Sequence, residues 1–195
     1  MDQGYCLRFE NYLMKVFIRS AIKKDYRAIA ALHAKSWQQN YRGTFSDHFL
    51  DKEVVKDRFV VWSNRFVNPK ENQFVYIAEM ENSLVAFVCG YIDDDSEYGT
   101  LIDNLHVDSK FIGRGIGEKL MLEAALFLKK QDRSCMYLWV LTSNKKAISF
   151  YERLGGKAME TVNDFDIGDR EITKTRYHWP NLKLILGHDH IKTDL

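Results

Sequence analysis

Short stretches in which hydrophobic and polar residues alternate recur along this chain, and such alternation predicts β-strands. The stretches expected as strands are Met14–Arg19, Phe74–Met80, Leu84–Ile92, a central run from Leu101, Met136–Leu141 and Ile172–Trp179. Glu81–Ser83 is a short polar turn typical of a hairpin, whereas Asp93–Gly99 breaks the alternation before the central run. Met136–Leu141 is apolar on both faces, which favours a strand that is covered on each side.

Hydrophobic residues spaced three or four positions apart predict helices between these strands. This spacing covers Lys24–Trp37, about Lys52–Phe66, and a helix after a glycine-rich turn, where Ile116, Leu120, Ala124 and Leu128 recur at every fourth position. A further helix is expected after Thr142–Asn144, whose side chains can cap it, and Gly155 is expected to end it.

The antiparallel strands come first and the strand–helix–strand units follow. We therefore expect an α/β (α+β) fold with a mixed, mostly antiparallel central sheet flanked by helices. A length of 195 residues suits one domain, which we place at residues 14–180. Residues 1–13 show no clear period and are expected to form an N-terminal extension, with 181–195 as a C-terminal segment. An edge strand or the final segment could support a homodimer, and the sequence leaves the oligomeric state open.

Charge and cysteine content narrow the class of protein. Lys and Arg number 28 against 27 Asp and Glu, so no global field favours nucleic acid or an anionic membrane as a partner. Cys6, Cys89 and Cys135 are odd in number, and two lie in strand-like runs, so we expect reduced thiols. The apolar runs are far shorter than a membrane span, and charges near the N-terminus argue against a signal peptide. These features predict a cytoplasmic protein.

A glycine-rich turn connects the central strand run to the helix that follows it. Gly113, Gly115 and Gly117 occupy alternate positions where this helix must begin. Their missing β-carbons let a ligand approach the main chain. The first amides of a helix have no intrahelical acceptors and carry the positive end of its dipole. The turn therefore predicts a cradle that suits a pyrophosphate.

Spacing argues against two other phosphate-binding motifs. A P-loop needs Gly-Lys-Ser or Gly-Lys-Thr, and this turn reads Gly-Ile-Gly-Glu at residues 115–118. A dinucleotide-binding turn needs its third glycine one place later and an acidic residue at the end of the next strand, which here runs into Thr142-Ser143-Asn144. A nucleoside triphosphatase and a nicotinamide-dependent oxidoreductase are both disfavoured.

The turn resembles the signature of the GNAT superfamily of acyl-CoA-dependent N-acetyltransferases, Gln/Arg-x-x-Gly-x-Gly/Ala between a strand and a long helix. It aligns with residues 112–117, with Ile112 in place of the leading Gln or Arg. Because one polar side chain is missing, main-chain amides and Arg114 are expected to carry more of the phosphate contact. Residues 144–155 are similar to a second family element, Asn-x-x-Ala-x-x-Phe-Tyr-x-x-x-Gly, with Gly156 where the family usually has Phe. Together the two elements extend the resemblance over about Met14–Trp179.

The resemblance implies that the chain binds acetyl-CoA as cosubstrate and acetylates a primary amine. It places main-chain groups of Leu105, His106 and Val107 along the pantetheine arm, between the central strand and a neighbour that diverges from it. The pyrophosphate would lie against Ile112, Gly113, Arg114, Gly115, Ile116 and Gly117. Asn144 is expected to bond the arm or only to cap its helix.

Tyr151 corresponds to the general acid of the family. A phenol with a pKa of about 10 stays protonated at neutral pH and can give its proton to the departing thiolate, and the alternative role is a core aromatic. The base is left open among His106, Asp103 and Glu97, because only side chains on the acceptor side of the strand can serve. His106 has the most suitable ordinary pKa, with a buried structural histidine as the alternative.

The predicted helical pair flanks the acceptor site in this family. Trp37, Tyr41 and Phe45 are therefore expected to line a substrate pocket or to pack as core. The acidic residues in Asp93–Glu97 are expected to form a solvated turn, with attraction of a cationic substrate as the alternative. The sequence His-Asp-His at 188–190 has no matching ligand set near it in sequence, so we predict no metal site.

Two functions stay open at this point. One is an N-acetyltransferase that acts on a primary amine of a small molecule or a protein. The other is a non-catalytic acyl-CoA-binding or regulatory module that keeps the cradle, because Ile112 and Gly156 depart from the family pattern. The acceptor amine is not identified by the sequence.

Overall fold

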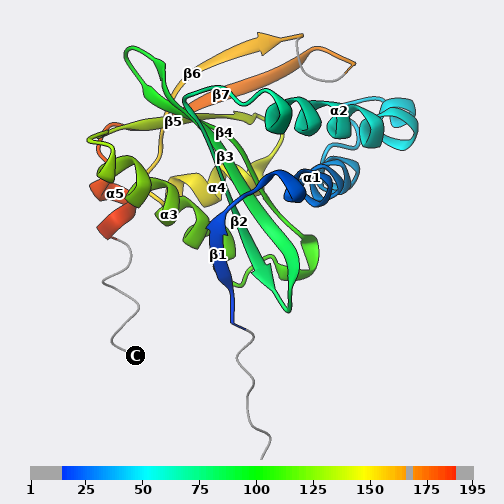
Figure 1. Cartoon of the computed structure of the whole chain (residues 1–195). Helices are drawn as coiled ribbons and strands as arrows, with labels where there is room; N and C mark the ends of the chain where they lie inside the picture. The colour runs from blue at the N-terminus through cyan, green and yellow to red at the C-terminus, as the bar shows by residue number, and fades with distance from the viewer. Residues whose placement is uncertain (1–14, 166–168, 188–195) are drawn as a thin grey trace, which may run out of the picture.

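A computed structural model describes residues 15–165 and 169–187 (Figure 1). The strands in this part of the chain are β1 (Phe17–Ser20), β2 (Gln73–Met80), β3 (Ser83–Asp95), β4 (Gly99–Val107), β5 (Met136–Leu141), β6 (Lys157–Asp164) and β7 (Ile172–Trp179). The helices are α1 (Tyr26–Asn40), α2 (Val54–Val67), α3 (Ile116–Lys130), α4 (Lys145–Arg153) and α5 (Lys183–Leu186), with single turns η1 (Lys23–Asp25), η2 (Phe49–Glu53) and η3 (Ser109–Phe111). The predictions for residues 1–13 and 188–190 lie outside the described residues.

The strands form one sheet in the order β1-β2-β3-β4-β5-β7-β6. Every neighbouring pair is antiparallel except β4 and β5, which are parallel. The predicted mixed, mostly antiparallel sheet is therefore confirmed. The hairpin between β2 and β3 is confirmed as well: Met80 pairs with Ser83, and Glu81 and Asn82 between them have φ of 50° and 60°. Positive φ at both central residues gives the turn a twist that matches that of the strands.

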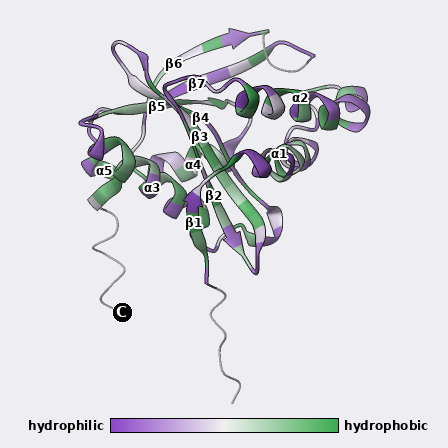
Figure 2. Cartoon of the chain, in the orientation of Figure 1, coloured by the Kyte–Doolittle hydropathy of each residue, from purple (hydrophilic) through white to green (hydrophobic). Residues whose placement is uncertain are grey.

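Helices α1 and α2 cover one face of the sheet, and α3, α4 and α5 lie on the other (Figure 1). Because successive side chains of a strand point to opposite faces, Phe87 of β3 packs in the cluster under α1 and α2, and Val88 packs in the cluster under α3. Figure 2 shows the result as hydrophobic central strands and a more hydrophilic β6–β7 hairpin.

The expected break at Asp93–Gly99 is wrong in its first half, because β3 continues to Asp95, which pairs with Gly99. The acidic side chains are held by partners from other elements. Arg133 donates to Asp93 at 2.8 Å, the Tyr137 hydroxyl donates to Asp94 at 2.7 Å, and Arg176 lies 3.5 Å from Asp95. These acidic groups therefore brace the sheet end, and they form neither a merely solvated turn nor a free anionic patch.

The sequence does not predict β6. In the structure Lys157–Asp164 pairs with β7 as the edge strand of the sheet. Nearly all of its residues are exposed, including Met159 at 50%. Hydrophobic and polar residues alternate in a strand when one of its faces is buried. Because β6 has no buried face, its sequence does not alternate and does not predict a strand.

Two consecutive glycines link α4 to β6. Gly155 has φ of +82°, the left-handed conformation that commonly ends a helix. Gly156 lies against the fully buried Trp179 ring of β7, and a Cβ at this position would stand 2.6 Å from Trp179 Cζ2. The indole is fixed by its own hydrogen bond, from Nε1 to the Leu154 carbonyl oxygen at 2.8 Å. Trp179 thus explains why a glycine stands where the family usually has Phe.

The chain after β7 continues to pack on the domain. Leu182 and Ile185 are buried in the cluster under α3, with 3% and 2% of their surfaces exposed. The residues from 181 to 187 therefore contribute to the same core as the sheet, although their spacing is too short to reveal a helix in the sequence.

Gly156→Ala should lower the free energy of unfolding by roughly 1 to 3 kcal/mol, because the new methyl group has no space beside a ring that cannot move. Gly187→Ala is the matched control, since a Cβ there meets nothing within 4 Å. Chemical denaturation of the two variants measures the difference. Equal stabilities would contradict the packing described for Trp179.

Candidate active site

The parallel strands β4 and β5 pair at only two positions, Thr100 with Met136 and Leu101 with Tyr137. Beyond these pairs β4 stays with β3, and β5 stays with β7 along its whole length. The two strands therefore part, and main-chain groups of Leu105, His106 and Val107 that point away from β3 face a gap instead of a strand. The side chains of Leu105 and Val107 pack against the α3 cluster, as expected for residues that offer only their main chain.

The glycine turn lies at the end of β4, at the start of α3. Gly113 and Gly115 have φ of +83° and +74°, and a Cβ on either would meet nothing within 4 Å. The first helical hydrogen bond runs from Lys119 N to the Gly115 carbonyl oxygen, so the amides just before it have no carbonyl of α3 to bond. An open space bounded by these amides fits an anionic group such as a pyrophosphate.

The residues of the turn contribute in different ways. The Ile116 side chain is only 1% exposed, so its amide alone can reach a ligand, and Ile112 is 64% exposed. A Cβ at Gly117 would lie 3.4 Å from the Phe150 ring and 3.6 Å from Val107. Gly117 therefore allows α3, α4 and β4 to approach one another, while Gly113 and Gly115 keep the space outside the turn open.

An ion pair ties the turn to the opposite helix layer. Lys35 Nζ of α1 lies 2.7 Å from Asp108 Oδ2, and Asp108 Oδ1 accepts a hydrogen bond from Lys110 N at 3.0 Å. The Lys35 charge holds the pKa of Asp108 below its ordinary value, although partial burial opposes this. The sequence gives no signal for this contact, because the two residues are 73 positions apart and belong to different predicted elements.

Tyr151 lies in α4 with 8% of its surface exposed, and its ring packs edge-on against Trp179 at a centroid distance of 6.0 Å. Burial, together with the nearby Tyr41 phenol, raises the pKa of Tyr151. Burial also raises the pKa of Tyr41 to about 12. Tyr41 directly follows α1, on one face of the sheet, and Tyr151 belongs to α4, on the other face. Both are protonated at neutral pH.

His106 is half-buried, faces α1 and lies in a polar group with the buried His33. Its Nδ1 lies 2.8 Å from Ser36 Oγ, and its ring lies 4.4 Å from the His33 ring. Trp62 Nε1 donates to His33 Nδ1 at 2.9 Å, which fixes the tautomer of a neutral His33 with its proton on Nε2. Burial, with the Arg58 charge, lowers the pKa of His106 to about 3. Burial lowers the pKa of His33 well below its ordinary value, assisted by His106, Arg58 and Arg65.

The other two candidate bases lie in different surroundings. Asp103 is half-buried and pairs with Arg65 of α2 at 2.7 Å, and it accepts a hydrogen bond from Asn104 at 2.5 Å. Glu97 is exposed in the turn before β4, at the end of the strand remote from the glycine turn. The structure thus brings His106 and Asp103 to the α1–α2 side of β4 and leaves Glu97 apart from them.

The aromatic residues proposed for a substrate pocket do not share one environment. Trp37 and Phe45 stack with their ring centroids 5.1 Å apart and are 5% and 2% exposed, so they belong to the core. The Arg58 guanidinium lies 4.3 Å above the Trp37 ring. Tyr41 is only partly buried at the edge of this cluster, which makes it the most accessible of the three.

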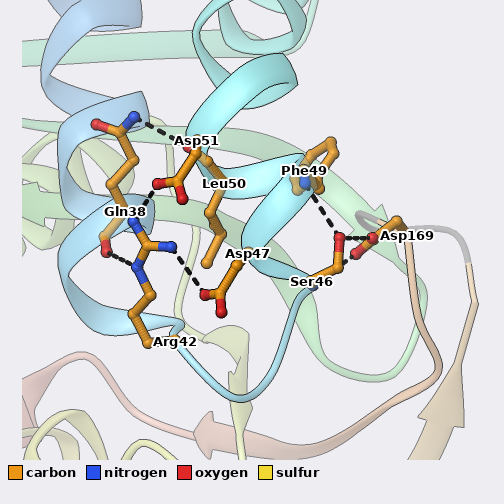
Figure 3. A network of polar contacts seen from close by, with 8 residues as sticks. All are labelled: Gln38, Arg42, Ser46, Asp47, Phe49, Leu50, Asp51 and Asp169. Carbon is orange, nitrogen blue, oxygen red and sulfur yellow. Dashed lines mark hydrogen bonds and ion pairs between the residues drawn. The ribbon is translucent and has the colours of Figure 1, made fainter.

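The linker between α1 and α2 is fixed beside this cluster by polar contacts (Figure 3). Arg42 pairs with Asp47 at 2.8 Å and also with Asp51, and Gln38 Nε2 donates to the Leu50 carbonyl oxygen at 2.9 Å. Ser46 N donates to Asp169 Oδ1 at 3.1 Å, which connects the linker to the segment between β6 and β7. These contacts fix the linker on the α1–α2 side of the sheet.

Asn144 caps α4: its Oδ1 accepts a hydrogen bond from Ala147 N at 3.1 Å. This confirms the capping role, and the side-chain Nδ2 is left to point elsewhere. Within residues 15–165 and 169–187, no group of three or more His, Cys, Asp and Glu side chains is arranged to hold a metal ion. No helix in the same residues is long and apolar enough to cross a bilayer.

A sheet that divides beside a glycine turn, with a protonated phenol at the division, defines a site for an acyl-CoA thioester. Residues 26–156 match the acetyltransferase (GNAT) family. The chain belongs to this family, and it is an N-acetyltransferase that uses acetyl-CoA.

Two relatives illustrate the range of similarity. The chain is 29% identical over 164 residues to an uncharacterised N-acetyltransferase of Methanocaldococcus jannaschii, covering 82% of this chain and 69% of the relative. It is 23% identical over 155 residues to a protein of Thermoplasma acidophilum named spermidine N(1)-acetyltransferase, covering 76% of this chain and 92% of that one.

Solved structures show the same fold. The PaiA N-acetyltransferase of Thermoplasma acidophilum in complex with coenzyme A superimposes with a TM-score of 0.70 at 20% identity, covering 85% of this chain and 100% of that one. A putative GNAT acetyltransferase of Desulfovibrio desulfuricans gives a TM-score of 0.66 at 14% identity, covering 86% and 99%. At these identities the likeness concerns the fold.

Gly115→Val should weaken acetyl-CoA binding by about tenfold or more while leaving the fold intact, because its side chain enters the open space and disfavours φ of +74°. Gly43→Val is the matched control: it has φ of +80° and equally open surroundings, but it lies in the α1–α2 linker. Calorimetry gives both affinities. Equal affinities would remove the cradle from the site.

The lowered pKa values of His33 and His106 should make stability fall in mild acid. The folded pKa of His106 is about 3 against an ordinary value of 6.5, so its contribution is complete above pH 6.5 and is lost as pH falls toward 3. Between pH 6.5 and 5 the loss should be about 2 kcal/mol. His106→Gln should flatten the curve of unfolding free energy against pH, whereas His48→Gln, at an exposed side chain, should not. An unchanged slope in His106→Gln would contradict the assignment.

Proposed function

We propose that the chain transfers the acetyl group of acetyl-CoA to a primary amine that enters the gap between β4 and β5 from the α1–α2 side. The observation that carries this proposal is the parting of β4 from β5 beyond Leu101, with the buried Tyr151 on the α4 side and the partly buried Tyr41 on the α1 side. Cofactor and acceptor would then meet in the gap, each entering from its own face. Such an arrangement orders the two reactants before the chemical step.

The cofactor is assigned to the α3 and α4 side. Amides of the turn around Gly113 and Gly115 bind the pyrophosphate, and Arg114, which is exposed with its guanidinium 5.2 Å from the Phe111 ring centroid, adds a positive charge. Main-chain groups of β4 bond the pantetheine arm. Asn144 Nδ2 is the group of that residue left for the arm, since Oδ1 caps the helix.

Tyr151 is assigned as the general acid. Its hydroxyl makes no hydrogen bond to another side chain or main-chain group among the described residues, so its proton is available. The raised pKa keeps the phenol protonated through neutral pH, and the departing thiolate takes the proton as the bond from carbon to sulfur breaks. Tyr41 is assigned to the acceptor wall, with Trp37 and Phe45 packed behind it.

His106 is a weak base as it stands, and Asp103 is occupied by an ion pair. The pKa of His106 is about 3, so the ring is neutral but gains little by accepting a proton, and Asp103 is engaged by Arg65. We therefore assign proton removal to water that reaches the amine, with His106 and Asp103 as groups that orient this water or the amine. Glu97 has no part in this assignment, because it lies at the other end of β4.

The acceptor is a primary amine whose identity is to be found by screening. The named activity of the Thermoplasma acidophilum relative makes spermidine one of the first amines to include. The panel should also hold short diamines, amino sugars and peptides with a free amino group. Release of free CoA thiol above the rate of acetyl-CoA hydrolysis supports the proposal. Binding of acetyl-CoA with no amine-dependent release would favour the non-catalytic module.

Tyr151→Phe should lower turnover by roughly 10²- to 10⁴-fold with acetyl-CoA affinity nearly preserved, because the change removes the proton donor and keeps the ring. Tyr177→Phe is the matched control, since Tyr177 is equally buried but donates to Glu152 at 3.0 Å, away from the gap. Turnover should stay near the wild-type rate in this control. A wild-type rate in Tyr151→Phe, under conditions where chemistry limits turnover, would refute the acid role.

The pH dependence of the reaction separates water from His106 as the proton acceptor. With water, kcat/KM for the amine should rise about tenfold per pH unit up to the amine's own pKa, because only the free amine reacts. His106→Gln should keep this shape. An inflection in this profile that lies below the amine's own pKa and disappears in His106→Gln would instead identify His106 as the base.

A further inference from the structure

A groove of about 410 Å³ lies between α1 and α2 on the side away from the sheet. It is lined by Arg27, Ala30 and Ala31 of α1, Lys52 of η2, and Val55, Lys56 and Phe59 of α2. The buried side chains of the same helices, such as Ile29 and Trp62, pack toward the sheet. The groove is therefore separate from the gap between β4 and β5.

The floor of the groove is apolar and open to solvent. Val55 is 57% exposed and Phe59 is 37% exposed, and Val60 beside them is 49% exposed. Hydrophobic side chains that gather at a concave surface, with polar residues around them, are typical of a binding site.

The rim of the groove is positively charged on both walls. Arg27 stands on one wall, with its guanidinium 5.4 Å from the Phe59 ring centroid, and Lys52 and Lys56 stand on the other. Among the described residues, none of these three cations forms an ion pair with a carboxylate.

The neighbouring carboxylates are already engaged. Asp51 pairs with Arg42, Asp57 pairs with Arg58, and Glu53 contacts His48. Arg27, Lys52 and Lys56 therefore surround the apolar floor as three cations that no carboxylate of the described residues pairs with. Their charge is complementary to carboxylates supplied from outside.

We propose that this groove binds an acidic segment of another protein, in which an apolar side chain is flanked by carboxylates. The apolar side chain enters between the helices and contacts Val55 and Phe59, and carboxylates on each side of it meet Arg27 and the two lysines. A nucleic-acid backbone would leave the apolar floor uncovered. A flat lipid surface cannot enter a concave site. The proposal is independent of the acetyl transfer.

A library of random peptides of about 12 residues, displayed on phage, tests the proposal. Peptides are selected on the wild-type chain after depletion on R27E/K52E/K56E. The control is K130E/K157E/K183E, which changes the charge equally at exposed lysines far from the groove. Circular dichroism and acetyl-CoA affinity verify that both variants are folded, since none of these residues belongs to the cofactor site.

The selected peptides should combine at least two Asp or Glu residues with an apolar one. A synthetic representative should bind the wild type and the control equally, and R27E/K52E/K56E roughly tenfold or more weakly. Its affinity should fall as salt rises, and Val55→Ser should weaken it about threefold or more at constant salt.

Three results would overturn the proposal. They are failure to enrich any peptide, enrichment of peptides without acidic residues, and equal affinity for the wild type and R27E/K52E/K56E. If instead phosphatidylglycerol vesicles or single-stranded DNA bind in a manner that depends on the three cations, and no peptide does, the groove recognises phosphate and the proposal is wrong.

Discussion

The structure depends on the separation of β4 from β5. The sheet consists of two antiparallel parts, β1-β2-β3-β4 and β5-β7-β6. They are joined through two parallel residue pairs, at Thr100 and Leu101 of β4. Each part satisfies the hydrogen bonds between its own strands, and the main-chain groups of β4 that face the gap are left for a ligand or for water. A fully paired junction would close the place where a thioester arm can lie. The gap therefore results from the pairing of the strands and does not depend on any one side chain.

The two helix layers are connected around this junction by polar contacts of long sequence separation. Lys35 joins α1 to the start of the glycine turn, and Ser36, one residue later, meets His106 of β4. On the other side, Ser46 joins the α1–α2 linker to Asp169. The α1–α2 linker, where we propose the acceptor binds, and the glycine turn are therefore both connected to α1. This pre-organisation reduces the ordering that substrate binding must supply.

Burial decides the protonation states at the site. The phenols of Tyr41 and Tyr151 have raised pKa values and the imidazoles of His33 and His106 have lowered ones, because an apolar environment disfavours every charged form. The site at neutral pH is thus neutral in its proton donors and acceptors, and its fixed charges are ion pairs such as Arg65 with Asp103. Such a site suits a neutral proton donor better than a strong base, because a base that accepts a proton becomes charged. A free amine that arrives uncharged needs no base until its nitrogen has attacked the thioester.

The sequence by itself determined the elements whose physics is local. Alternation located the buried strands, the glycines located the start of α3, and the resemblance of two motifs to those of the GNAT superfamily implied the family and its cosubstrate. The pattern did not predict β6, because no face of that strand is buried. The acidic end of β3 was expected to be a loop, because its partners Arg133, Tyr137 and Arg176 are distant in sequence. Only the tertiary structure decided that Gly156 makes room for Trp179, that Trp37 and Phe45 are core, and that His106 is bonded to Ser36. These outcomes depend on contacts between residues far apart in the chain, and local periodicity carries no information about which distant side chain will occupy a given space.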